Sequence, residues 1–166
     1  MSAIFTGPHD EYRVRLERDV EPLLGGPIAA LLGVNPSTAD AIENDATIRK
    51  DIGFGRRLGW RRIIKGNKFG WRATDVRELA RVADPIGRET DRHLEQIMRD
   101  ADLVVACWGP LAKLPARLRN RWRDVAAIAE AVGKPLYCFG TAGDGQPLHT
   151  LMLPYSTPLQ LWSAPQ

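Results

Sequence analysis

The chain has 166 residues, a length that suits one domain with a buried core and is short for two. Its residues are 44% hydrophobic and 26% charged, as in folded globular proteins, which excludes intrinsic disorder and fibrous repeats. The 23 Lys and Arg residues outnumber the 20 acidic ones and give a net charge of +3. This charge permits a polyanionic partner without requiring one.

No export signal or membrane segment is visible, because no run approaches the roughly 18 apolar residues of a membrane helix. We therefore expect a cytoplasmic protein. Cys107 and Cys138 lie within apolar runs and lack metal-ligand spacing, so we expect buried thiols. The three His residues are scattered, and no motif of a common cofactor is present, so we expect neither a metal nor a cofactor.

Strands and helices are expected to alternate along the chain. Polar and apolar residues alternate over 12–20, which predicts an edge or half-exposed strand, and the apolar run 28–34 predicts a buried strand. The elements expected next are a helix over about 48–58, a strand over 62–65, a helix over 90–100, a strand over 103–108, a helix over 115–132, a strand over 136–139 and an edge strand over 159–162. This order predicts a single three-layer α/β/α domain with a mostly parallel four-stranded central sheet plus edge strands.

Four polar loops follow the four central strands. Their sequences are NPSTAD (35–40), NKFGWRATD (67–75), WGP (108–110) and GTAGDGQPLH (140–149). Because the carboxyl ends of parallel strands meet at one edge of a sheet, we expect these loops to lie together and to form a ligand site.

The first loop and the residues that follow it supply the candidates Asn35, Ser37, Asp40 and Asp45. Asn35 either holds a water or a planar ligand, or bonds only its own loop. Ser37 either contacts a phosphate or caps the next element. The two carboxylates are open to pairing with an Arg, to binding a metal or to acting as a base.

The other loops supply Asn67, Arg72, Trp108 and His149. Asn67 either reads a base edge or satisfies loop backbone. Arg72 either grips a phosphate or carboxylate or forms an internal ion pair. Trp108 is expected to be half core and half pocket wall. His149 either donates to an anion, acts as an acid or is simply exposed.

Basic residues concentrate in two stretches, 49–62 and 113–123. They form either a phosphate-tracking surface or the solvated faces of two helices. The candidates for a nucleic-acid surface are Arg56, Arg57, Arg61, Lys113 and Arg117.

Several blocks of this sequence resemble the signature blocks of a bacterial family, domain of unknown function sixteen forty-three. The blocks are GVNPSTAD (33–40), NDATIRK (44–50), NKFGWRATD (67–75), DPIG (84–87), ACWG (106–109) and GTAGDGQPLH (140–149), and the resemblance spans about 12–162. The family implies no settled activity. The chain departs from its usual pattern at Lys68 (usually Leu), Gly70 (Ala), Leu148 (Arg) and Thr150 (Pro).

The order of strands and polar loops is also similar to that of the uracil-DNA glycosylase superfamily. The resemblance implies a fold of that kind and cleavage of the N-glycosidic bond of a nucleobase. It implies that Asn35 orients the hydrolytic water, that Asn67 reads a base edge and that His149 stabilises the departing anion. The chain departs from the superfamily at Ser37, where the first loop has Gly, and in the residues that follow His149.

Three functions fit these residues. The first is a hydrolase acting on a nucleobase in nucleic acid or a nucleoside, with Asn35, His149 and Asp40 as catalytic residues. The second is a non-catalytic nucleic-acid or nucleotide binder. The third is a small-molecule hydrolase or transferase that uses Asp40 or Asp45 with Arg72. The expected partner is thus a nucleobase, nucleotide or nucleic acid and not a membrane, and the sequence indicates no protein partner.

Overall fold

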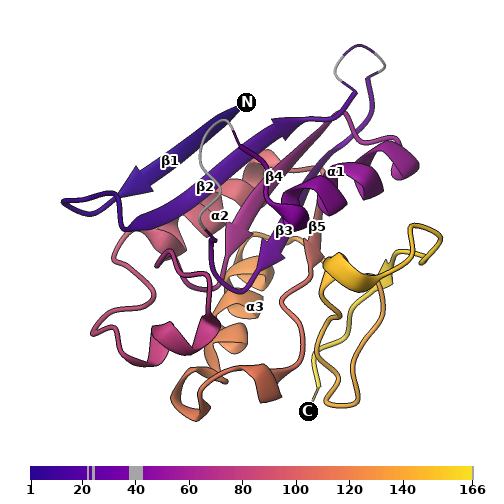
Figure 1. Cartoon of the computed structure of the whole chain (residues 1–166). Helices are drawn as coiled ribbons and strands as arrows, with labels where there is room; N and C mark the ends of the chain where they lie inside the picture. Colours follow the sequence, from indigo (N-terminus) through magenta and orange to yellow (C-terminus); the bar gives the residue numbers. More distant parts are fainter. Residues whose placement is uncertain (22, 24, 38–42, 166) are drawn as a thin grey trace.

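A seven-stranded mixed sheet forms the centre of the computed structural model, which describes residues 1–21, 23, 25–37 and 43–165 (Figure 1). The strand order is β1-β2-β4-β3-β5-β6-β7. The strands are β1 (Ser2–Thr6), β2 (Tyr12–Asp19), β3 (Ile28–Gly33), β4 (Arg62–Asn67), β5 (Leu103–Ala106), β6 (Leu136–Cys138) and β7 (Gln160–Leu161).

The four central strands β4, β3, β5 and β6 run parallel. β2 and β7 pair antiparallel with β4 and β6, and β1 pairs antiparallel with β2. β3 lies between β4 and β5, which is why its residues 29–33 form a continuous buried run. The predicted parallel core is confirmed, and the carboxyl ends of its strands lie at one end of the sheet.

Helices cover both faces of the sheet (Figure 1). They are α1 (Ala46–Leu58), α2 (Thr90–Asp100) and α3 (Arg121–Ala131). α1 packs on one face, whereas α2 and α3 pack on the other, so each face of the sheet has its own apolar core. Asp45 caps the start of α1 and Gly59 ends it in the left-handed conformation, with φ of 71°.

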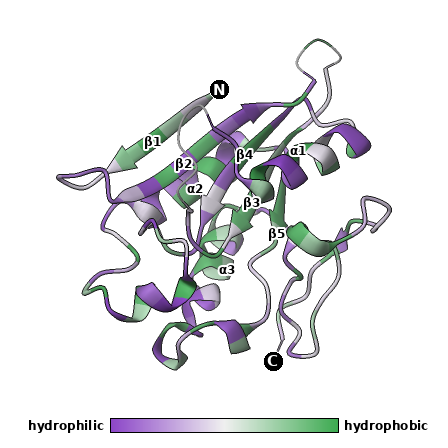
Figure 2. Ribbon diagram, in the orientation of Figure 1, coloured by the Kyte–Doolittle hydropathy of each residue, from purple (hydrophilic) through white to green (hydrophobic). Residues whose placement is uncertain are grey.

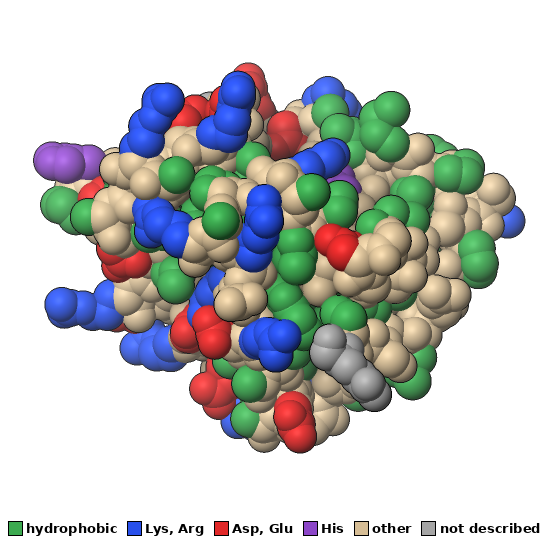
Figure 3. Space-filling view, turned by 90° about the horizontal axis from the view of Figure 1, so that it is seen from below, with side chains coloured by type: hydrophobic (Ala, Val, Ile, Leu, Met, Phe, Trp, Pro, Cys, Tyr) green, Lys and Arg blue, Asp and Glu red, His purple; other side chains and the backbone are tan. Residues whose placement is uncertain are grey.

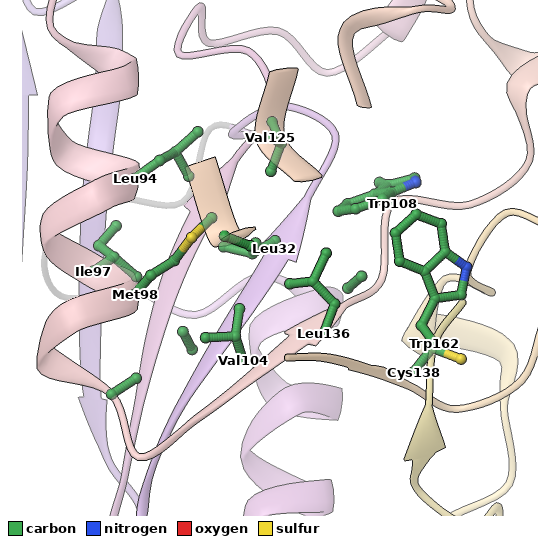
Figure 4. Close-up of a cluster of buried hydrophobic side chains, with 14 of the residues drawn as sticks. Leu32, Leu94, Ile97, Met98, Val104, Trp108, Val125, Leu136, Cys138 and Trp162 are labelled. Carbon is green, nitrogen blue, oxygen red and sulfur yellow. The ribbon is translucent and has the colours of Figure 1, made fainter. Parts of the chain in front are cut away.

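The larger core lies between the sheet and the α2–α3 layer (Figure 4). Leu32 and Val104 meet Leu94, Ile97 and Met98 of α2 there. Hydropathy colouring shows that β3 and β5 are mostly green, whereas the helices also carry purple, polar segments (Figure 2). Cys107 and Cys138 are buried free thiols, as predicted.

Three features differ from the prediction. β1 was not expected, and because it pairs with β2, the strand at 12–19 is internal to the sheet rather than at its edge. The helix expected over 115–132 begins only at Arg121. Pro110 and Pro115 have extended ψ angles, and each is followed by a short 3-10 turn instead of an α-helix.

The described part of the chain has no helix that is both long and apolar enough to cross a membrane.

Candidate functional site

A cavity of about 180 Å³ opens where β3 and β4 end. Its walls come from β2, from the loop after β3, from the start of α1, from β4 and from the loop that holds His149. The lining residues are Arg13, Gly33, Val34, Asn35, Ser37, Asp45, Thr47, Ile48, Lys65, Asn67 and His149. The structure thus brings together five sequence-predicted site residues, namely Asn35, Ser37, Asp45, Asn67 and His149.

Gly33 lets two polar side chains pack directly against its backbone at the cavity. A Cβ atom at Gly33 would lie 2.7 Å from Asn67 Oδ1 and 3.2 Å from Lys65 Cε, closer than side chains normally pack. Gly33 is paired in register with Asn67 across the two strands. The missing side chain of Gly33 therefore keeps the polar ends of Lys65 and Asn67 uncovered.

Asn35 both holds its loop and faces the cavity. Its Nδ2 donates to the carbonyl oxygens of Ala73 at 2.7 Å and Pro36 at 3.1 Å. No hydrogen bond within the described residues uses Asn35 Oδ1. The amide nitrogen of Asn35 is thus committed to the scaffold, and the oxygen is left to accept from a ligand or a water.

Asp45 is a fixed carboxylate at the start of α1. Ser37 Oγ donates to its Oδ2, and the backbone N–H of Ile48 donates to its Oδ1 at 2.7 Å. Burial raises the pKa of Asp45, but these two hydrogen bonds and the charges of Arg13 and Lys65 outweigh burial and hold the pKa below its usual value. Asp45 is therefore ionised at neutral pH and accepts hydrogen bonds there.

Asn67 lines the cavity with an amide group that is unpaired within the described residues. It is only 5% exposed, and its amide makes no hydrogen bond to a described residue. Burying an amide without partners is costly, so this side chain is suited to a ligand or a water that donates and accepts at once.

His149 presents a neutral N–H to the cavity. Its Nδ1 accepts from the backbone N–H of Leu151 at 3.2 Å, so the proton of the neutral ring is on Nε2. Burial and then the charge of Lys65 lower the pKa of His149 to about 4. At neutral pH the ring is thus an uncharged hydrogen-bond donor.

Sequence reasoning missed Arg13, Lys65 and Asp51. Lys65 Nζ donates to Asp51 Oδ2 at 2.7 Å, and Thr150 Oγ1 donates to Asp51 Oδ1 at 2.6 Å. Lys65 and Asp51 are both buried. A Lys inside the apolar strand Arg62–Asn67, and an Asp between Ile48 and Phe54 on the apolar face of α1, were the available signals.

Arg72 and Trp108 do not line the cavity. The Arg72 guanidinium lies 5.0 Å from the ring centroid of Phe5 in the unpredicted strand β1, and its Nη1 donates to the carbonyl of Asp10 at 3.3 Å. Trp108 is a core residue rather than a pocket wall: it packs edge-on against Trp162 and donates to Gln146 Oε1 at 2.8 Å (Figure 4). The predicted catalytic residue Asp40 lies outside the described residues.

The predicted basic residues differ in their surroundings. Arg117 Nη2 donates to the carbonyl oxygens of Leu79, Ala80 and Val82, which ties it to the fold, and Arg56 pairs with Glu21 at 3.7 Å. Arg57, Arg61 and Lys113 are exposed. On the face toward which β3 points, basic side chains are interspersed with acidic ones (Figure 3). A nucleic-acid surface therefore stays a prediction.

Within the residues described, no group of three or more His, Cys, Asp or Glu side chains is arranged to hold a metal ion. The polar groups that line this cavity are two amides, two hydroxyls, a carboxylate, an ammonium, a guanidinium and a neutral imidazole.

Comparisons with known proteins give one match. No curated protein and no solved structure matches the chain, so the resemblance to uracil-DNA glycosylases stays a prediction. A family model described as "Protein of unknown function (DUF1643)" matches residues 13–151, a span that contains every residue of the cavity lining. The chain therefore belongs to the DUF1643 family, as its sequence blocks predict.

Proposed function

We propose that the cavity binds a nucleobase and that the protein hydrolyses the N-glycosidic bond of that base in a nucleoside or a nucleic acid. The observation that carries the proposal is the buried amide of Asn67, which has no described hydrogen-bond partner and lines the same cavity as the neutral N–H of His149. An amide group pairs naturally with the adjacent N–H and C=O groups of a base edge.

The size of the cavity favours a base over a whole nucleotide. Sites for drug-sized ligands usually enclose about 300–1,000 Å³, whereas this cavity measures about 180 Å³. A single ring is therefore the part of the substrate that enters, and the sugar remains at the mouth.

Four of the predicted residues take a role in this reaction. Asn67 holds the base edge, and His149 Nε2–H donates to the base as it leaves. Asn35 Oδ1 and the Asp45 carboxylate accept hydrogen bonds from the attacking water. Water adds to the anomeric carbon, the C–N bond breaks, its electron pair goes to the base, and the proton lost by the water ends on the departing base.

The two alternatives fare differently. A hydrolase or transferase that pairs Asp45 with Arg72 loses support, since Arg72 contacts Phe5 and the turn at Asp10 instead of the cavity. A non-catalytic binder would use the same residues toward the same ligand, and it differs from the proposed enzyme only in turnover.

The test is a base-release assay with modified nucleosides and with single-stranded and double-stranded DNA, run beside a binding assay with free bases. Asn67→Ala should lose base binding. His149→Asn, which keeps an oxygen that can accept from Leu151, should still bind free bases but should cleave the base from its sugar far more slowly. His93→Ala, on α2 and outside the cavity lining, is the matched control. Release that is unchanged in both cavity variants would overturn the proposal, and binding without any turnover would favour the binder.

A further inference from the structure

We propose that Lys65 is an anion-binding residue of this cavity and that the preferred bases are acidic heterocycles, whose negative charge spreads onto a carbonyl oxygen attached to the ring. This inference rests on the proposed function and names its substrate class. It assigns to the cavity the positive charge of Lys65, which neither Asn67 nor the neutral His149 supplies.

The hydrogen bonds of Lys65 leave one of its donors unused. Its Nζ donates to Asp51 Oδ2 at 2.7 Å and lies 3.6 Å from the Sγ atom of Cys107. An ammonium group has three N–H bonds, and the third has no partner among the residues that the structure describes. Because Lys65 lines the cavity, the third N–H is available to a ligand there.

Lys65 and Asn67 lie close together at the cavity because residue 33, against which both pack, is Gly. A Cβ atom at that position would stand 3.5 Å from Lys65 Nζ and 2.7 Å from Asn67 Oδ1. A ligand oxygen can therefore approach Lys65 and Asn67 from the same side, over the backbone of Gly33.

Asp51 fixes the position and the charge of Lys65. Burial alone lowers the pKa of Lys65, but the charge of Asp51, the neighbouring Cys107 thiol and their hydrogen bonds together raise it above its usual value. Asp51 is itself held by Thr150 Oγ1 at 2.6 Å and is fully buried. The ammonium is thus charged and preorganised, and its counterion does not line the cavity.

Lys65 and His149 act on the same region. The charge of Lys65 is the second-largest cause of the lowered pKa of His149, after burial, which places the two groups within electrostatic reach of each other. His149 donates a neutral N–H, and Lys65 supplies the full positive charge. As the C–N bond breaks, its electron pair makes the base an anion, and the ammonium stabilises that charge without transferring a proton.

The test compares two ring ligands of similar shape by calorimetry on the full chain at pH 7. Uracil is neutral at this pH, whereas barbiturate, a stronger acid of the same ring type, is already an anion. We expect barbiturate to bind about tenfold tighter than uracil or more, because a charge-assisted hydrogen bond is stronger than a neutral one.

Two variants separate the contribution of Lys65 from its role in folding. Lys65→Met should remove the preference for barbiturate; if it fails to melt cooperatively, the double variant with Asp51→Leu, which removes both charges, replaces it. Gly33→Ala places a methyl group 2.7 Å from Asn67 Oδ1 and 3.2 Å from Lys65 Cε, which shifts both side chains, and should weaken barbiturate binding at least tenfold. Gly143→Ala is the control, since a Cβ there meets no atom within 4 Å.

The outcomes distinguish this inference from the proposed function. Equal affinity for the two rings, with both lost in Asn67→Ala, overturns the role of Lys65 and leaves the base-binding site standing. A preference for barbiturate that survives in the Lys65 variants also overturns it. If the folded chain binds neither ring, the proposed function fails, and the inference fails with it.

Discussion

Lys65 and Lys68 lie three residues apart and are both buried, but only the ammonium of Lys65 has a hydrogen-bond acceptor among the described residues. Lys65, in β4, points to the α1 face, where Asp51 accepts from its Nζ at 2.7 Å. Lys68, just past the end of β4, is fully buried toward the core of the other face, with its Nζ 5.3 Å from the ring centroid of Trp108. Its Nζ finds no hydrogen-bond acceptor in the part of the chain that is described.

The pKa values of the two lysines diverge accordingly. The partners of Lys65 raise its pKa despite its burial. Burial and then the charge of Arg121 lower the pKa of Lys68 to about 7. A buried ammonium is stable where acceptors are built around it, whereas a cation–π contact alone does not keep it charged. The cavity face is thus organised for charge, and the opposite face tolerates Lys68 at a cost in stability.

Breaking the Lys65 pair should have the largest effect. Asp51→Leu leaves a buried ammonium without its partner and should lower the free energy of unfolding by about 3–5 kcal/mol. Denaturant unfolding measures this change. Glu95→Gln, which breaks the exposed pair with Arg99 on α2, is the control and should cost less than about 1 kcal/mol. A loss for Asp51→Leu as small as that of the control would contradict the difference between the two faces.

Removing Lys68 should have the opposite sign. Lys68→Leu introduces the residue usual in the second loop of the family and replaces an unsatisfied buried amine with an apolar side chain. We expect a gain of about 1–3 kcal/mol in the free energy of unfolding at pH 7. The same unfolding assay measures it, and a clear loss of stability would show that the amine has a partner that stabilises it.

The pH dependence of stability should separate the two lysines in one experiment. The folded pKa of Lys68 is about 7, below the ordinary Lys value of 10.5, so between these values the unfolded chain binds the proton that the folded chain has released. Stability should therefore rise with pH between 7 and 9, by about 1 kcal/mol per pH unit. Lys65, whose folded pKa is raised, is protonated in both states over this window and contributes no slope.

Lys68→Leu should remove this rise of stability with pH, so the variant is the control for the wild-type measurement. The window ends at pH 9 because burial raises the pKa of the Cys107 thiol from 9.0 to about 11, and at higher pH the loss of stability from Cys107 offsets the gain from Lys68. A rise of the same size in the variant would assign the effect to another group.

The smallest change should come from the outer part of the Lys65 network. Thr150→Val removes the hydroxyl that donates to Asp51 Oδ1 at 2.6 Å and keeps the shape of the side chain. We expect a loss of about 1–2 kcal/mol in stability, well below that of Asp51→Leu. An equal loss in the two variants would mean that Thr150, and not the ion pair, dominates this network.

The sequence predicts well the strands and loops that position the site. Continuous apolar runs such as 28–34 indicate the central strands, and polar loops at their ends place Asn35, Asn67 and His149 at one edge of the sheet. Topology alone brings these three residues together, because parallel strands share a carboxyl end.

The missed residues depend on contacts between elements distant in sequence. Lys65 stood at the expected end of a strand, where a Lys is ordinarily exposed, and nothing in the sequence pairs it with Asp51 on α1. Arg72 was expected at the site because its loop follows β4, but its guanidinium packs on Phe5 of the short strand β1 instead of lining the cavity. Trp108 is held in the core by Gln146, a contact that no spacing indicates.

The most direct test of the base-binding cavity is a crystal structure of the full chain with barbiturate. We expect the ring to lie over Gly33, with its oxygens within hydrogen-bond distance of Lys65 Nζ and His149 Nε2 and one edge on the Asn67 amide. A ring bound elsewhere, or an empty cavity at saturating barbiturate, would contradict the account.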